Sequence, residues 1–118
     1  MAKTTPTHFK QFKAECERYV NLFGLQRYEV VYTHDFDEDA RASVNATIEH
    51  GIAVINLSTE WGDSDPLNKN EIRLCALHEV RELFYWQVRV MLEPYYSTEL
   101  INQRIHALIR TDERTFKK

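Results

Sequence analysis

Apolar and polar residues alternate along this chain with a period that changes several times. Thr5-Pro6 is typical of a helix start, and apolar residues then recur at spacings of three and four up to Gly24, which predicts an amphipathic helix. The apolar face of this helix consists of Phe9, Phe12, Cys16, Tyr19 and Phe23. Aromatic and β-branched residues at positions 28–33 next predict a strand, and an acidic loop follows it.

The strictest alternation lies in residues 40–49. Even-numbered positions there are mostly apolar and odd-numbered positions are polar, a pattern that predicts a half-buried strand. His50-Gly51 is a turn sequence, and the apolar run at 52–57 predicts the second strand of a hairpin. Glycine, proline and acidic residues in the segment 58–68 indicate a loop.

Two further helices are expected after this loop. From about residue 69 to 92, apolar residues appear nearly all round the helix, which is typical of a helix in the core. Pro94 ends it, and a last helix begins near Thr98 and frays over residues 114–118. The order of one helix, three strands and two helices predicts a single α+β domain over 1–118, with a three-stranded, mainly antiparallel sheet.

The most apolar helix also holds charged residues that packing alone does not explain. Burying an unpaired charge is costly, so His78, Glu79 and Glu82 need partners. Positions 78 and 82 are four apart and share one helix face, and imidazole and carboxylate both bind Zn²⁺. Glu79 projects about 100° round the helix from His78, where it can take a proton from a metal-bound water, as Glu does in the His-Glu-x-x-His motif.

A catalytic zinc site needs a third protein ligand, and His106 is the candidate. The last helix follows the motif helix after a short break, and helices so joined tend to pack antiparallel. The predicted site is then His78, Glu82 and His106 around one Zn²⁺, with Glu79 as catalytic base. The alternative is that Glu82 pairs with a cation such as Arg81 or Arg89, and that His78 is a hydrogen-bonded core histidine.

Composition narrows the class of partner. The net charge is −3 with both signs mixed along the chain, which disfavours binding to nucleic acid through bulk charge. Cys16 and Cys75 lie on apolar helix faces and are expected to be buried free thiols. No apolar run approaches the roughly 20 residues of a membrane span, and residues 1–6 hold no apolar signal core, so we expect a cytoplasmic protein without a membrane partner.

The motif helix, Leu-His-Glu-Val-Arg-Glu-Leu-Phe at 77–84, resembles the active-site helix of minimal zincin-like metallopeptidases. The chain is similar to small phage-encoded proteins of this kind, which are distantly similar to the SprT-like and ImmA/IrrE-like proteins. The likeness covers most of the chain, through segments at 9–16, 28–30, 40–43, 55–58 and 105–110.

This resemblance implies a minimal zincin-like fold and a zinc-dependent peptidase acting on a peptide or protein substrate. It implies His78 as a zinc ligand and Glu79 as the catalytic base. Glu82 departs from the histidine that most zincins have at this position. That departure favours an alternative function, an inactive zincin-fold module that binds or inhibits a host protein.

Three residues are candidates for substrate contact. In zincins a sheet edge often holds the substrate as an added strand, and the resemblance assigns that edge to the strand at 41–49 or its hairpin partner, with Asn45 as a polar contact. Asn45 could equally face solvent on a half-buried strand. Tyr95 and Arg110 could line a cleft and stabilise an oxyanion, or could serve packing or the surface. Substrate identity, the metal and the oligomeric state stay open at this point.

Overall fold

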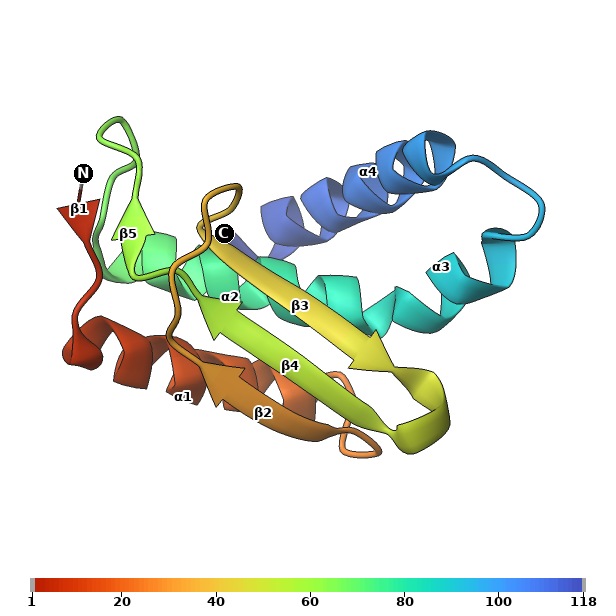
Figure 1. Ribbon diagram of the computed structural model, residues 1–118, viewed down its shortest axis with the longest axis horizontal. Coiled ribbons are helices and arrows are strands. Elements are labelled where there is room, and N and C mark those ends of the chain that lie inside the picture. Colours follow the sequence, from red (N-terminus) through yellow and green to blue (C-terminus); the bar gives the residue numbers. More distant parts are fainter. Residues whose placement is uncertain (1, 118) are drawn as a thin grey trace.

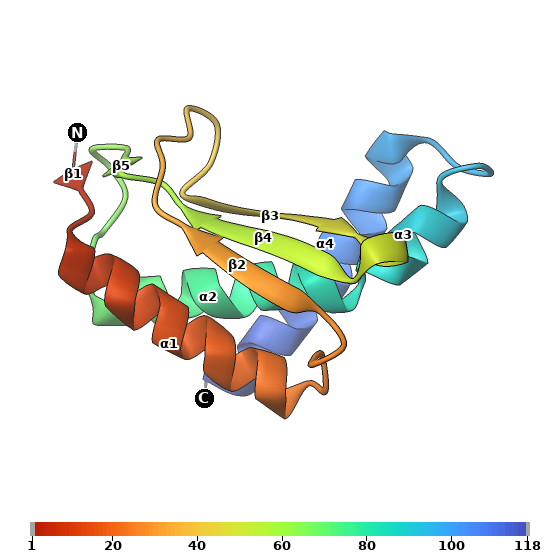
Figure 2. The same ribbon diagram turned by 60° about the horizontal axis from the view of Figure 1, so that its bottom comes forward.

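The computed structural model describes residues 2–117, with side chains described through Arg114. The chain has the α+β composition that the sequence predicts. In chain order the elements are β1 (Ala2–Lys3), α1 (Pro6–Leu22), β2 (Glu29–Thr33), β3 (Ala42–Thr47), a 3-10 turn η1 (Ile48–His50), β4 (Ile52–Leu57), β5 (Glu60–Trp61), α2 (Lys69–Phe84), α3 (Trp86–Leu92) and α4 (Thr98–Lys117). Figures 1 and 2 show the main sheet in one layer, with α1 and α2 side by side against one of its faces.

The main sheet has the strand order β2-β4-β3 and is mixed, which corrects the expectation of a mainly antiparallel sheet. β3 and β4 form the predicted antiparallel hairpin, whereas β2 pairs with β4 in parallel. The loop after β2 crosses to the far edge of the sheet, where β3 lies. The chain then turns back, and β4 lies between β2 and β3. Thr33 Oγ1 donates a 2.7 Å hydrogen bond to Asn56 Oδ1 across the parallel pair.

Two segments of the sheet region differ from the sequence prediction. The strand expected at 40–49 is shorter, because Ile48–His50 forms a 3-10 turn that ends at Gly51 with φ of 65°. The segment 58–68 is not all loop, because β5 pairs with β1 in a second, two-stranded sheet. Trp61 of β5 is 1% exposed, so burial of this indole holds the small sheet against the core.

The helices also differ in part from the prediction. Thr5 caps α1, accepting a 3.2 Å hydrogen bond from the backbone N–H of His8. The helix expected at 69–92 is interrupted at Tyr85, whose ψ of 1° separates α2 from α3. Helix α4 continues through Lys117, where we expected a frayed tail; Lys118 lies outside the described residues.

The core divides into two clusters of unequal size. The larger one fills the space between α1, α2 and the main sheet, and it contains Cys16 and Cys75 as buried free thiols. The smaller cluster consists of Ile101, Ile105 and Ile109 on α4, with Tyr85 and Leu92 against it. We call residues 2–84 the body and residues 86–117 the C-terminal arm. Among the described residues, no helix combines the length and the apolar character needed to cross a membrane.

Candidate metal centre

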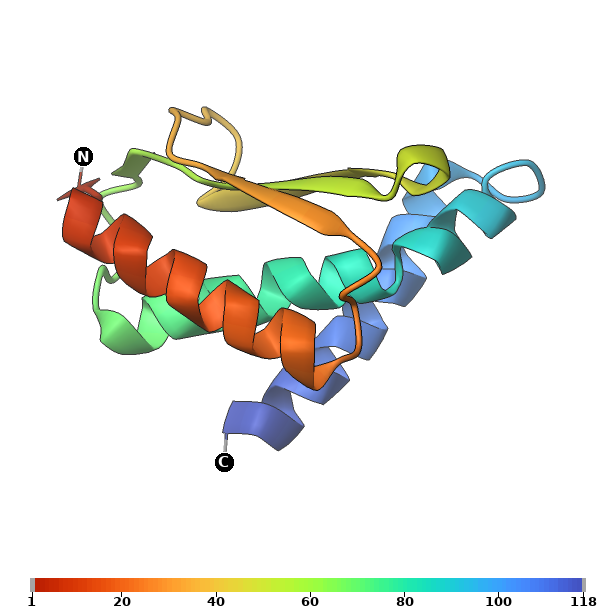
Figure 3. The same cartoon turned by 90° about the horizontal axis from the view of Figure 1, so that it is seen from below.

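The site lies where α4 of the arm crosses α2 of the body. Figure 3 shows α4 running back beneath α2 after the α3–α4 connection. His78, Glu79 and Glu82 lie in the second half of α2, and His106 lies in the middle of α4. The helix crossing therefore brings residues distant in sequence to one place, as the short break between the helices led us to expect.

The side chains of His78, Glu82 and His106 converge. His106 Nε2 lies 3.2 Å from Glu82 Oε1, and His78 Nε2 lies 3.7 Å from Glu82 Oε2. The two imidazole rings are stacked, with centroids 5.7 Å apart. One candidate ligand atom from each residue lies within 4.8 Å of the other two. Among residues 2–114, no other three His, Cys, Asp or Glu side chains come together in this way.

This donor set fits a divalent cation. Zinc bonds of about 2.0–2.2 Å in tetrahedral geometry place neighbouring ligand atoms roughly 3.3 Å apart. The separations of 3.2 and 3.7 Å join the two histidines to different oxygens of Glu82. With one ligand atom from each residue, the three atoms lie within 4.8 Å of one another, somewhat wider than a bound ion would hold them. Two imidazoles and one carboxylate also form a donor set that catalytic zinc sites use. The three side chains could therefore hold a divalent metal ion after small adjustments.

A second carboxylate, which the sequence analysis missed, holds His78. Glu113 Oε1 on α4 lies 2.7 Å from His78 Nδ1, so the other ring nitrogen, Nε2, is the one that faces Glu82. Metal-binding histidines commonly donate their second N–H to a carboxylate in this way, which fixes the ring and its tautomer. We had placed Glu113 beside a frayed tail. Its spacing of seven residues from His106, two turns of one helix, was the signal that it shares that face.

Glu79 is the most deeply buried acid of the site. It is 5% exposed, and its Oε1 has no hydrogen-bond partner among the described residues. Burial, and after it the charge of Glu82, raise the pKa of Glu79 to about 8. In folded proteins a buried carboxyl oxygen of this kind is satisfied by a protein group, a water, an ion or a ligand.

For His78, the effect of neighbouring charges on the pKa outweighs the effect of burial. Burial alone would lower its pKa, but the hydrogen bond with Glu113 and the nearby carboxylates raise the pKa above its ordinary value. The three carboxylates thus make this part of the molecule strongly favourable for positive charge.

The alternative of simple ion pairing is partly present as well. Arg89 lies 3.8 Å from Glu82 Oε1, so a cation does accompany this carboxylate. Arg81 is engaged elsewhere, with Asp112 at 3.4 Å and over the ring of Phe23 at 3.8 Å. His78 is not a core histidine, because 34% of its side chain is exposed. Ion pairing with Arg89 therefore accounts for part of the charge of Glu82, and the two half-buried imidazoles lie against the same carboxylate.

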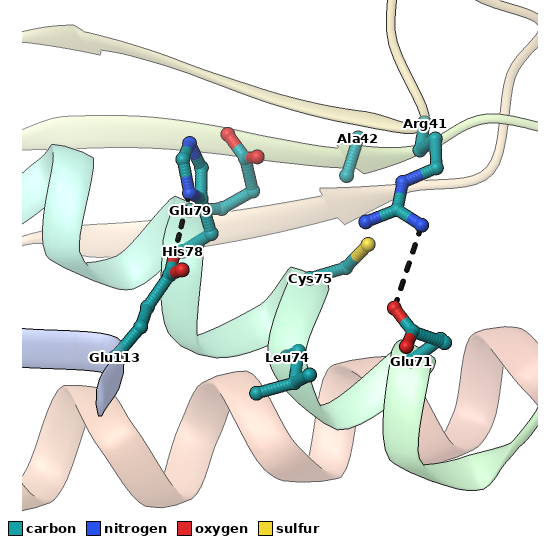
Figure 4. A pocket seen from close by; sticks show the side chains of 8 residues that line it. All are labelled: Arg41, Ala42, Glu71, Leu74, Cys75, His78, Glu79 and Glu113. Carbon is teal, nitrogen blue, oxygen red and sulfur yellow. Dashed lines mark hydrogen bonds and ion pairs between the residues drawn. The ribbon is translucent and has the colours of Figure 1, made fainter. Parts of the chain in front are cut away.

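A cavity of about 380 Å³ opens beside Glu79. It extends from His78, Glu79 and Glu113 to Arg41 and Glu71 at the other end (Figure 4). One wall is α2 and the facing wall is the start of β3. The candidate base therefore faces a space large enough for a few residues of a peptide.

The three predicted substrate contacts lie away from this cavity. Asn45 is exposed on β3, on the face opposite the inward-pointing Ala42 and Ala46. Tyr95, in the α3–α4 connection, is 80% exposed, and Arg110 is exposed on α4. None of the three lines the cavity, and their role in substrate binding stays a prediction.

Comparison with known proteins does not assign this chain to a class of protein, so the class is described by the fold and the geometry of the site. No family model, curated protein or solved structure matches this chain. The class is that of a small α+β protein with a His₂Glu donor set on two crossing helices and a buried glutamate beside it.

Proposed function

We propose that this chain is a zinc-dependent hydrolase with a minimal zincin-like fold, and that it acts as a metallopeptidase on a peptide or protein substrate. One observation carries the proposal: His78, Glu82 and His106 converge from two helices next to the buried, partnerless carboxylate oxygen of Glu79. Burial of such a group is costly unless a proton, a bound ion or a reacting molecule compensates it.

The fold supports this proposal through the relation of α2 to the sheet. The motif helix packs under β3, which is an edge strand and antiparallel to its neighbour. An extended substrate could lie along that edge, above the residues of α2. The cavity beside Glu79 opens between the same two elements.

The roles of the residues follow from their positions. A zinc ion held by His78, Glu82 and His106 would supply Lewis acidity, which polarises a carbonyl group and makes water a stronger nucleophile. Glu79 accepts the proton of the attacking water and delivers it to the leaving amine. Glu113 fixes the ring of His78 through Nδ1, so that Nε2 keeps its direction.

A second function is favoured by one observation. Glu82 replaces the histidine of most zincins, and it already has His106 at 3.2 Å and Arg89 at 3.8 Å. These neighbours neutralise the carboxylate without any metal. That arrangement suits a binding module that has kept the fold and lost catalysis.

The replacement of Glu79 by glutamine tests the catalytic role. We expect Glu79→Gln to bind zinc as the unchanged chain does and to lose about 10²–10⁴-fold in turnover, because a general base is removed. Zinc content is measured by mass spectrometry and turnover with fluorescently labelled casein. Glu49→Gln, at an exposed position of η1, is the matched control.

Two results would contradict the proposal. Full turnover in Glu79→Gln would remove the base from its role. A purified chain that binds no zinc, cleaves nothing and captures a protein partner would favour the binding module.

A further inference from the structure

The cavity beside Glu79 has a second charged end, seven residues before His78 on α2. Glu71 lies there, and Arg41 at the start of the β3 segment faces it, with Arg41 Nη1 3.6 Å from Glu71 Oε2. Seven residues of helix correspond to roughly 10 Å along the axis. Figure 4 shows Arg41 and Glu71 at one side of the cavity and His78 and Glu79 at the other. One continuous space therefore joins the candidate base to this pair.

The guanidinium of Arg41 is held in place by Trp61. Its Cζ lies 4.8 Å from the centre of the indole ring. The ring itself is fixed, because Trp61 is 1% exposed and its Nε1 donates a 3.2 Å hydrogen bond to the carbonyl oxygen of Arg41. A stacked guanidinium keeps its plane and loses little conformational freedom when it binds a ligand.

The donors of this guanidinium are largely unused. Its contact with Glu71, at 3.6 Å, is an ion pair longer than a hydrogen bond. Among the described residues, the Arg41 side chain donates no hydrogen bond, and 35% of it is exposed. A fixed guanidinium fork with free N–H groups is suited to two parallel hydrogen bonds with a carboxylate.

The direction of a bound peptide depends on the sense in which it pairs with the edge strand β3. The backbone N–H of Ser58 on the β4 side donates to the carbonyl oxygen of Arg41. With the register of β3 and β4, this directs the backbone groups of Ala42, Val44 and Ala46 away from β4. A peptide that pairs antiparallel with this edge runs with its C-terminal side toward Arg41. At about 3.3 Å per residue, the distance from His78 spans about three residues.

We propose that Arg41, stacked on Trp61, binds a carboxylate of the substrate about three residues beyond the scissile bond on its C-terminal side. The carboxylate is either the C-terminus of a short peptide or the side chain of an acidic residue. Glu71 keeps the guanidinium directed into the cavity. The inference rests on the proposed function for the meaning of the scissile bond, but carboxylate binding itself needs no turnover.

Nuclear magnetic resonance of the folded, full chain tests the site directly. The Nε–H of Arg41 and the indole N–H of Trp61 report on the two side chains involved. The probes are tri-alanine as the free acid and as the amide, and N-acetylated Ala-Ala-Glu, Ala-Ala-Gln and Ala-Ala-Lys amides. Each probe is titrated into metal-free and zinc-loaded protein.

We expect the free acid to shift both signals and to bind roughly 10- to 100-fold more tightly than the amide, as a charge-assisted contact does. The glutamate and glutamine probes show whether a side-chain carboxylate is accepted as well. Arg41→Gln should abolish the preference, and Arg41→Lys, which keeps the charge but not the fork, should retain part of it. Arg27→Gln is the matched control, because Arg27 also stacks on an aromatic ring, Tyr28, but lies outside the cavity.

Three results would overturn the proposal. The first is equal binding of the tri-alanine acid and its amide. The second is a preference for the acid that remains in Arg41→Gln. The third is tighter binding of the lysine probe than of the glutamate probe, with this difference lost in Glu71→Gln. If Arg41→Gln does not fold, Arg41→Lys and the unchanged chain decide. A chain that cleaves nothing but selects carboxylates through Arg41 would contradict the proposed function alone. Cleavage that is indifferent to the carboxylate would contradict this inference alone.

Discussion

The body and the C-terminal arm are held together by different forces. The body buries large apolar side chains from α1, α2 and the sheet, and Phe12, Ile55 and Leu77 are all 0% exposed. Among its residues up to Arg114, the arm buries only three isoleucines of α4 and leaves large side chains such as Met91 and Tyr95 exposed, at 64% and 80%. Apolar burial drives folding in proportion to the area removed from water, so the body has the larger share of this stabilisation.

The contact between the two parts includes several polar pairs beside the packing of Trp86 against the larger cluster. Tyr85 Oη donates a 3.0 Å hydrogen bond to Asp112 Oδ2, and Asp112 also lies 3.4 Å from Arg81. The pairs of the candidate site, Glu82 with His106 and His78 with Glu113, belong to the same contact. The packing of the arm on the body therefore depends in part on the charged groups that the proposed function needs. A cation bound there would link α2 to α4 and stabilise the arm more than the body.

Two cavity-forming substitutions test this difference with the largest expected effect. Leu77→Ala in the body and Ile105→Ala in the arm should each cost roughly 2–5 kcal/mol, because both side chains are buried. Leu77→Ala should lower the free energy of unfolding of the whole chain. Ile105→Ala should mainly raise amide exchange in α4 and leave the body protected. Denaturation and hydrogen exchange provide the measurements, and uniform loss of protection in both variants would mean that body and arm are one cooperative unit.

Zinc should stabilise the folded chain, whereas the two substitutions destabilise it, and the effect should be larger in the arm than in the body. At a free zinc concentration of about 100 times Kd, a site present only in the folded chain stabilises it by about 2.7 kcal/mol. We expect slower amide exchange in α4, reversed by a chelator and absent in His106→Ala. His50→Ala, at an exposed position in η1, is the control. Equal slowing in His106→Ala would show that zinc binds elsewhere.

The smallest of the three effects concerns Glu113. Glu113→Gln should weaken zinc binding about 10- to 100-fold, because the carboxylate that orients His78 and increases its basicity is lost. Competition with a zinc indicator measures the affinity without any need for turnover. Glu99→Gln, at an exposed position of the first turn of α4, should leave the affinity unchanged. Unaltered zinc binding in Glu113→Gln would separate the histidine–carboxylate contact from the site.

Local patterns in the sequence predict most elements but not their partners. The cap at Thr5 and the period of α1 are local features, and so is the apolar run of β4, which the structure has at the predicted bounds of 52–57. Strand order depends on contacts between distant segments, so the parallel pairing of β2 with β4 has no local signal. The strand β5 within the predicted loop likewise has no local signal. It depends on pairing with the distant β1 and on the burial of Trp61 against the core.

The candidate site was predicted in part for a related reason. The spacing of His78 and Glu82 is a property of one helix and can be read directly from the chain. The approach of His106 required only the expectation that two joined helices fold back on each other. The spacing of Glu113 from His106 indicates only that the two share a helix face. The contacts that make Glu113 and Arg41 important lie between different elements, at 2.7 Å to His78 and at 3.6 Å to Glu71, and have no local signal.

The division of the site between α2 and α4 has a consequence during protein synthesis. Glu82 leaves the ribosome 24 residues ahead of His106, and His78 leaves it 35 residues ahead of Glu113. The body can therefore bury its apolar groups before the donor set exists. In the proposed peptidase, a nascent chain would carry the base Glu79 without the imidazole that completes the site. The hydrolytic activity of the proposed peptidase would thus arise only after α4 has been synthesised and has packed against α2.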